Sequence, residues 1–136
     1  MHRILLTAAL CLAAAGLTLH GGAIAQTAFK PRQGQEGKDA IWVPTPQPLV
    51  EKMLDIANLT SNDRLVDLGS GDGRMVIAAA KRGAVARGIE YDPRMVALSR
   101  LNAAKAGVSN KATFDEADIF ATDFSDASVV AIFLLP

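Results

Sequence analysis

Three glycines at alternate positions form the part of this chain best suited to hold a reactive ligand. Gly69, Gly71 and Gly73 directly follow residues 64–68, which have the apolar composition of a short strand. Glycines allow a sharp turn and let a ligand approach the backbone where a Cβ atom would collide. The helix predicted over residues 74–81 points its N-terminal amide groups at the same place. The pattern therefore predicts a nucleotide-like cofactor at the edge of an α/β sheet.

Two acids follow the next two predicted strands. Residues 85–90 end in Glu90, which lies 21 residues after Gly69, close to the roughly 20 residues expected for an acid that binds a ribose. Residues 112–117 form a further predicted strand, and Asp118 follows it. The glycine turn and both acids thus lie at the ends of three consecutive strands, where they are expected to meet one ligand.

Each of these features also has a purely structural explanation, as a tight turn, a helix cap or a solvated carboxylate. The glycine spacing is Gly-x-Gly-x-Gly, whereas the dinucleotide fingerprint is Gly-x-Gly-x-x-Gly. Asp67 precedes the first glycine by two residues. The spacing and this acid disfavour an NAD-type Rossmann oxidoreductase, which remains an alternative.

The elements that must position these residues alternate between helix and strand. Apolar periodicity and turn residues predict helices over residues 49–57, 74–81 and 92–106, and strands over 64–68, 85–90, 112–117 and 128–135. This order is typical of an α/β fold with a Rossmann-like, doubly wound parallel sheet. The last strand is almost wholly apolar, so we expect it to be buried on both faces. Because the sequence ends there, we expect a sheet truncated after its fourth strand.

Residues 1–25 have the features of a signal peptide. A basic start precedes an apolar run of 16 residues, and Ala23 and Ala25 fit the small-x-small cleavage rule. These features predict cleavage before Gln26 and a periplasmic or secreted protein without a stable membrane span. An uncleaved anchor is the alternative, although a bilayer span needs about 20 residues. Residues 26–40 are polar and predict a flexible linker, which leaves residues 41–136 as the cofactor-binding part of a domain.

Composition excludes several chemistries from the mature chain. Cys11, His2 and His20 all lie within residues 1–25. After cleavage the chain has no thiol nucleophile, no Ser-His-Asp triad and no Cys/His zinc site, and we predict no metal site. The 14 basic and 14 acidic residues give a net charge of zero. They form no basic block, so nucleic acid is not indicated as a partner.

Four segments together resemble a known family. They are Trp-Val-Pro-Thr-Pro-Gln-Pro at residues 42–48, the glycine run continued to residue 80, Gly-Ile-Glu-Tyr-Asp-Pro at 88–93, and Phe-Leu-Leu-Pro at 133–136. They resemble class I S-adenosylmethionine (SAM) dependent methyltransferases, in the group that includes the mitochondrial protein-lysine methyltransferases acting on adenine nucleotide translocase and on the membrane-ring component (the c protein) of ATP synthase. The resemblance implies a methyltransferase that uses SAM and methylates nitrogen, with lysine in a protein as a possible acceptor. A non-catalytic or degenerate SAM-fold fragment is the alternative, because SAM is not expected in an exported compartment.

The resemblance also implies roles for individual residues. Asp67, Gly69 and Gly71 would hold the methionine part of SAM, and Glu90 the ribose. Tyr91, Asp118 and Ile119 would contact the adenine, while Thr45 would receive the methionine carboxylate. The complete predicted cofactor set is Thr45, Asp67, Gly69, Ser70, Gly71, Glu90, Tyr91, Asp118 and Ile119. Residues 134–136 occupy the place of the acceptor-binding motif but offer no acid, amide or hydroxyl side chain, so we assign no catalytic residue.

Overall fold

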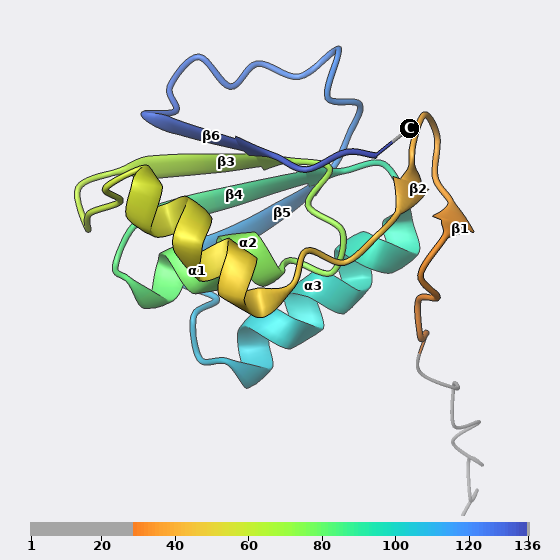
Figure 1. Cartoon of the computed structure of the whole chain (residues 1–136), viewed down its shortest axis with the longest axis horizontal. Coiled ribbons are helices and arrows are strands. Elements are labelled where there is room, and N and C mark those ends of the chain that lie inside the picture. The colour runs from red at the N-terminus through yellow and green to blue at the C-terminus, as the bar shows by residue number, and fades with distance from the viewer. Residues whose placement is uncertain (1–28, 136) are drawn as a thin grey trace, which may run out of the picture.

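A computed structural model describes residues 29–135, so the predicted signal peptide and its cleavage site lie outside the described residues. Along the chain the elements are β1 (Gln35–Glu36), β2 (Ile41–Trp42), α1 (Gln47–Ile56), β3 (Arg64–Leu68), α2 (Arg74–Lys81), β4 (Val85–Glu90), α3 (Pro93–Lys105), β5 (Ala112–Glu116) and β6 (Val129–Ile132) (Figure 1). Among these helices, none is long and apolar enough to cross a membrane.

The main sheet has four parallel strands in the order β5-β4-β3-β6. The chain builds outward from β3 through β4 to β5, and then returns to the other side of β3 to form β6. This reversal leaves a crevice at the carboxyl ends of β3 and β6, which is where open α/β sheets bind ligands. The structure confirms the predicted parallel α/β sheet and places the glycine turn, directly after β3, at this switch point.

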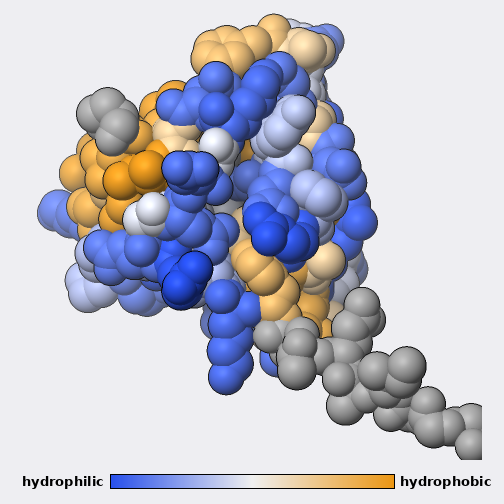
Figure 2. Space-filling model, turned by 90° about the vertical axis from the view of Figure 1, so that its right-hand side faces the viewer, coloured by the Kyte–Doolittle hydropathy of each residue, from blue (hydrophilic) through white to orange (hydrophobic). Residues whose placement is uncertain are grey.

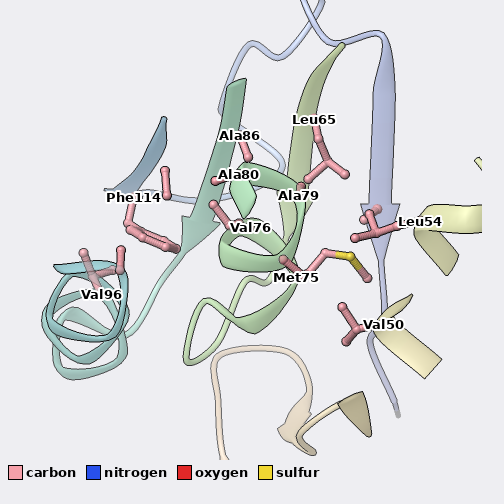
Figure 3. Close-up of a cluster of buried hydrophobic side chains, with 14 residues drawn as sticks. Val50, Leu54, Leu65, Met75, Val76, Ala79, Ala80, Ala86, Val96 and Phe114 are labelled. Atoms are coloured by element: carbon pink, nitrogen blue, oxygen red, sulfur yellow. The ribbon is translucent and has the colours of Figure 1, made fainter. Parts of the chain in front are cut away.

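The core lies mainly between the sheet and its three helices. Strand residues alternate between the two faces, so Leu65 points into the cluster shared with the helices, whereas Val66 points to the opposite face. Figure 3 shows Leu65 and Phe114 from the sheet directed at Val76 and Met75 of α2. On the opposite face, Val66, Leu68 and Ile89 are covered by side chains of the segment between β5 and β6, namely Ala117, Ile119, Phe124 and Ala127.

Two predicted elements need correction. Helix α1 begins at Gln47 and includes Pro48, two residues before the predicted start, because proline is tolerated in the first helical turn, where its missing N–H has no partner to lose. The last strand is shorter than predicted, and it is not buried on both faces. Val130 is 48% and Ile132 55% exposed, because β6 forms the edge of the described sheet and only its other face meets the core.

A short antiparallel hairpin lies beside the carboxyl ends of the parallel strands (Figure 1). Strands β1 and β2 form it, and the N–H of Gly37 donates to the carbonyl of Ala40 across its turn at 3.1 Å. Ile41 also forms an antiparallel bridge with Leu135, just after β6. We call residues 35–45 the strap. Residues 35–40 of the strap, which fall within the predicted flexible linker, therefore have a defined place in the fold.

Candidate functional site

A cavity at the carboxyl ends of the parallel strands contains every residue predicted to bind a cofactor. Its lining includes Thr45, Asp67, Gly69, Ser70, Gly71, Glu90, Tyr91, Asp118 and Ile119. Strands β3 and β4 and the segments after β3, β4 and β5 supply eight of these nine residues, and the strap supplies Thr45 and the remaining wall. The fold thus brings together residues that lie far apart in the sequence.

The glycine turn is fixed by hydrogen bonds to the end of β4. The N–H groups of Gly69 and Ser70 both donate to the carbonyl of Ile89, at 2.9 and 3.0 Å. Gly71 has a φ of 54°, a left-handed conformation that favours glycine. A Cβ atom at Gly71 would stand 2.6 Å from Nε1 of Trp42. The turn therefore has the close approach between backbone and strap that its glycines predict.

Glu90 links the glycine turn to the segment after β4. Its Oε2 accepts the N–H of Gly71 and its Oε1 accepts the N–H of Asp92, both at 2.9 Å. Hydrogen bonds of this charged type are stronger than neutral ones and hold the carboxylate in one orientation. Glu90 therefore presents a fixed acceptor at the cavity wall, as expected for a group that binds hydroxyls.

Asp67 is the most strongly perturbed acid of the site. Its side chain is only 7% exposed. Burial, and then the negative charges of Glu90 and Asp72, raise the pKa of Asp67 from 3.8 to about 7. A ligand cation near this carboxyl would stabilise its ionised form, so the electrostatics of the cavity favour a positively charged ligand.

Asp118 is engaged through both of its carboxylate oxygens. Its Oδ1 accepts the N–H of Phe120 at 3.0 Å, and its Oδ2 accepts Nζ of Lys38 at 2.5 Å. The Lys38 ammonium holds the pKa of Asp118 below its usual range. It also lies 5.1 Å from the centre of the Tyr91 ring. Sequence patterns do not reveal this role for Lys38, because its partners are distant along the chain.

Arg74 holds the end of the strap against the glycine turn. Its Nη1 donates to the carbonyl of Thr45 at 2.8 Å, while its Nη2 bonds the carboxylate of Asp72 at 2.5 Å. Asp72 is fixed in turn, because Nδ2 of Asn102 donates to its carbonyl at 3.0 Å. Arg74 belongs to the motif that carries the family resemblance, but its contact with Thr45 is visible only in the structure.

Ser70 differs from the other predicted residues because its side chain lies below the turn. It is 5% exposed, and within residues 29–135 its hydroxyl has no hydrogen-bond partner. A Cβ atom at Gly88 would stand 2.5 Å from Ser70 Oγ, so the glycine on β4 leaves room for the serine. Ser70 therefore fills space between the turn and the sheet.

The end of the molecule that carries the strap has a mixed surface. Figure 2 shows this side as largely hydrophilic, with hydrophobic areas at its margins. Ile41, Leu134 and Leu135 near the bridge between the strap and the segment after β6 are 38–42% exposed. Within the described residues, no group of His, Cys, Asp and Glu side chains is arranged to hold a metal ion. The site is thus a cleft for an organic ligand bounded by backbone, carboxylates and apolar side chains.

A Rossmann-like sheet with a glycine turn at its switch point and acids after the next strands defines the nucleotide-cofactor class of site. Residues 67–136 match the family model of the ANTKMT methyltransferase domain. The chain belongs to this methyltransferase family, which confirms the resemblance seen in its motifs.

Two relatives show how far the similarity extends. The chain is 40% identical over 96 residues to a protein-lysine N-methyltransferase of Saccharolobus islandicus (strain REY15A), which covers 69% of this chain and 60% of the relative. It is 50% identical over 72 residues to a human lysine N-methyltransferase named for the C component of ATP synthase, which covers 53% of this chain and 31% of that protein. The chain therefore spans between about a third and three fifths of these relatives.

Solved structures agree with this assignment. An RNA methyltransferase from Salinibacter ruber, bound to S-adenosyl-L-homocysteine (SAH), matches 69% of this chain and 62% of its own, with a TM-score of 0.67 and 49% identity. A SAM-dependent methyltransferase from Geobacter sulfurreducens, also bound to SAH, matches 62% of this chain and 35% of its own, with a TM-score of 0.55 and 30% identity. These neighbours confirm the class I methyltransferase fold and SAM as the cofactor of the class.

Proposed function

We propose that this protein binds SAM in the cavity at the switch point and transfers its methyl group to the side-chain nitrogen of a lysine in a protein. The observation that carries the proposal is the convergence of all nine predicted cofactor residues on one cavity. Relatives named as protein-lysine methyltransferases support the choice of acceptor.

The residues present fit the chemical groups of SAM. SAM carries a sulfonium and an ammonium cation, and the buried Asp67 carboxyl favours a cation beside it. Glu90 offers a carboxylate fixed by two N–H groups to the ribose hydroxyls. Asp118 offers an acceptor for the adenine amino group, and Ile119 an apolar contact for the ring. Gly69 and Gly71 leave the backbone free of side chains where the methionine part would lie.

SAM supplies a methyl group that is already activated by its bond to a positively charged sulfur. The protein must then align the acceptor nitrogen and keep water away from the reacting groups. Trp42, Phe133 and Leu134 line the cavity with apolar surface, which suits the exclusion of water. A lysine acceptor must also lose a proton before it can attack.

RNA is a second acceptor to be tested, because the Salinibacter relative is named an RNA methyltransferase. The zero net charge of the chain argues against it, since binding of nucleic acid depends on neutralising phosphates.

The acceptor can be identified by locating a labelled methyl group. The full chain would be incubated with methyl-labelled SAM and a cell extract that contains protein, lipid and RNA. We expect label in lysine side chains of protein, and the Asp67→Asn variant should greatly reduce it. Label confined to RNA, lipid or small molecules would contradict the lysine proposal and leave methyl transfer in place. Absence of all labelling and of SAH binding would contradict both.

Replacing Glu90 by alanine is expected to weaken SAH binding by about 5- to 150-fold, equivalent to about 1–3 kcal/mol. The variant lacks the ribose acceptor and leaves the N–H groups of Gly71 and Asp92 without their partner. Isothermal titration calorimetry would measure the loss. Glu116→Ala is the matched control, because Glu116 pairs with Glu90 in the strand register, is exposed and lies outside the cavity lining.

The same calorimeter tests the cofactor class. NAD should bind the wild-type chain negligibly beside SAH. Equal affinities for NAD and SAH would contradict the assignment, and equal losses in the Glu90 and Glu116 variants would remove the role given to Glu90.

A further inference from the structure

Lys38 occupies both of the contacts that the proposed function gives to adenine. Its ammonium donates to Oδ2 of Asp118 at 2.5 Å, and it lies 5.1 Å from the centre of the Tyr91 ring. Asp118 is the acid expected to accept from the adenine amino group, and Tyr91 is the ring expected to lie on the base. A single side chain of the strap therefore meets the polar and the aromatic part of the adenine site.

The second oxygen of Asp118 offers no simple way round this overlap. Oδ1 already accepts the N–H of Phe120 at 3.0 Å, and this bond holds the carboxylate in place. An adenine amino group that approaches Oδ2 must share or replace the Lys38 ammonium. A base that lies against Tyr91 meets the same ammonium on the ring.

We infer that Lys38 is an internal competitor of the cofactor's adenine, and that cofactor binding displaces it from Asp118. The inference rests on the proposed function, since it takes the adenine to lie at Asp118 and Tyr91. In the cofactor-free protein, the Lys38 contact holds the turn of the strap over the adenine end of the cavity.

The strap is built so that this end can open while the other stays in place. The Lys38 and Asp118 side chains are 37% and 31% exposed, and ion pairs this open to solvent are weak. At the other end, Arg74 bonds the carbonyl of Thr45 and the carboxylate of Asp72. Release of Lys38 therefore frees the turn of the strap, whereas the segment beside the glycine turn remains anchored.

A titration with SAH tests the competition directly. Lys38→Met keeps the length of the side chain and removes its charge. We expect this variant of the full chain to bind SAH about two- to fivefold more tightly than the wild type, the range that a weak ion pair allows. The gain should appear in the association rate, because a larger fraction of the free protein is ready to bind. Stopped-flow fluorescence of Trp42 would measure that rate.

Two further variants serve as controls. Lys38→Arg keeps the charge and should bind SAH as the wild type does. Lys52→Met removes an exposed lysine on α1 that does not line the cavity, and it should also leave binding unchanged. Unchanged or weaker binding by Lys38→Met, with normal wild-type binding, would overturn the competition and leave the proposed function intact. Failure of the wild type to bind SAH would overturn the proposed function, and the competition with it.

Discussion

Replacing Gly73 by alanine is expected to lower the free energy of unfolding by about 2–5 kcal/mol. Gly73 precedes α2 with a φ of 84°, a left-handed conformation that costs other residues about 1–2 kcal/mol. A Cβ atom there would stand 2.7 Å from Cβ of Ser99 and 2.8 Å from the Phe114 ring. Both neighbours are buried, so relief of the overlap must disturb the core.

Urea unfolding followed by circular dichroism would measure this loss. Gly107→Ala is a matched control, because Gly107 also has a left-handed φ, of 71°, but its Cβ atom would meet nothing within 4 Å. We expect the control to lose only the backbone part, about 1–2 kcal/mol. Equal losses in the two variants would show that contact with Ser99 and Phe114 does not matter. A typical domain has only about 5–15 kcal/mol in total, so Gly73→Ala should leave little stability.

Asp67→Asn is expected to stabilise the free protein at neutral and alkaline pH while it weakens SAM binding. The pKa of Asp67 is raised from 3.8 to about 7 in the fold. Its protonated form therefore contributes stability that is complete below pH 3.8 and is lost as the pH rises through about 7. Asparagine carries no charge, so above pH 7 the variant should be more stable than the wild type by up to about 4 kcal/mol. Unfolding curves from pH 4 to pH 9 would measure the difference.

The same carboxyl should make cofactor binding depend on pH. A SAM cation beside Asp67 favours its ionised form, so binding below the pKa of about 7 must release a proton. We expect the affinity of the wild type to fall by up to about tenfold for each pH unit below this value, and that of Asp67→Asn to stay nearly constant. Glu116→Gln should retain the wild-type dependence. A flat wild-type profile would contradict the position given to the cation.

Local patterns were sufficient to predict the elements that form the floor of the site. The predicted bounds of residues 64–68, 74–81 and 85–90 match β3, α2 and β4, because apolar runs bounded by glycine and charged residues determine these elements locally. The glycine turn and Glu90 could be placed together because carboxyl ends of parallel strands meet at one edge of a sheet. The sequence order alone therefore identified the switch point.

The strap and the exposed face of β6 could not be predicted in the same way. Strands β1 and β2 have two residues each, which is too short for any periodicity, and Lys38 contacts Asp118 across most of the described chain. The apolar residues of β6 predicted burial, but burial depends on which strand lies at the edge of the sheet. Long-range pairing decides both features, and a single sequence does not record it.

The bridge between Ile41 and Leu135 has a consequence for the order in which the molecule assembles. The two residues lie near opposite ends of the described chain, so the entropy of closing this long loop must be offset by a sheet that already exists. The ribosome makes the strap before any parallel strand, yet the strap can dock only after β6 has been added beside β3. The wall it contributes to the cavity is therefore completed last during folding, and partial unfolding would release it before the sheet itself separates.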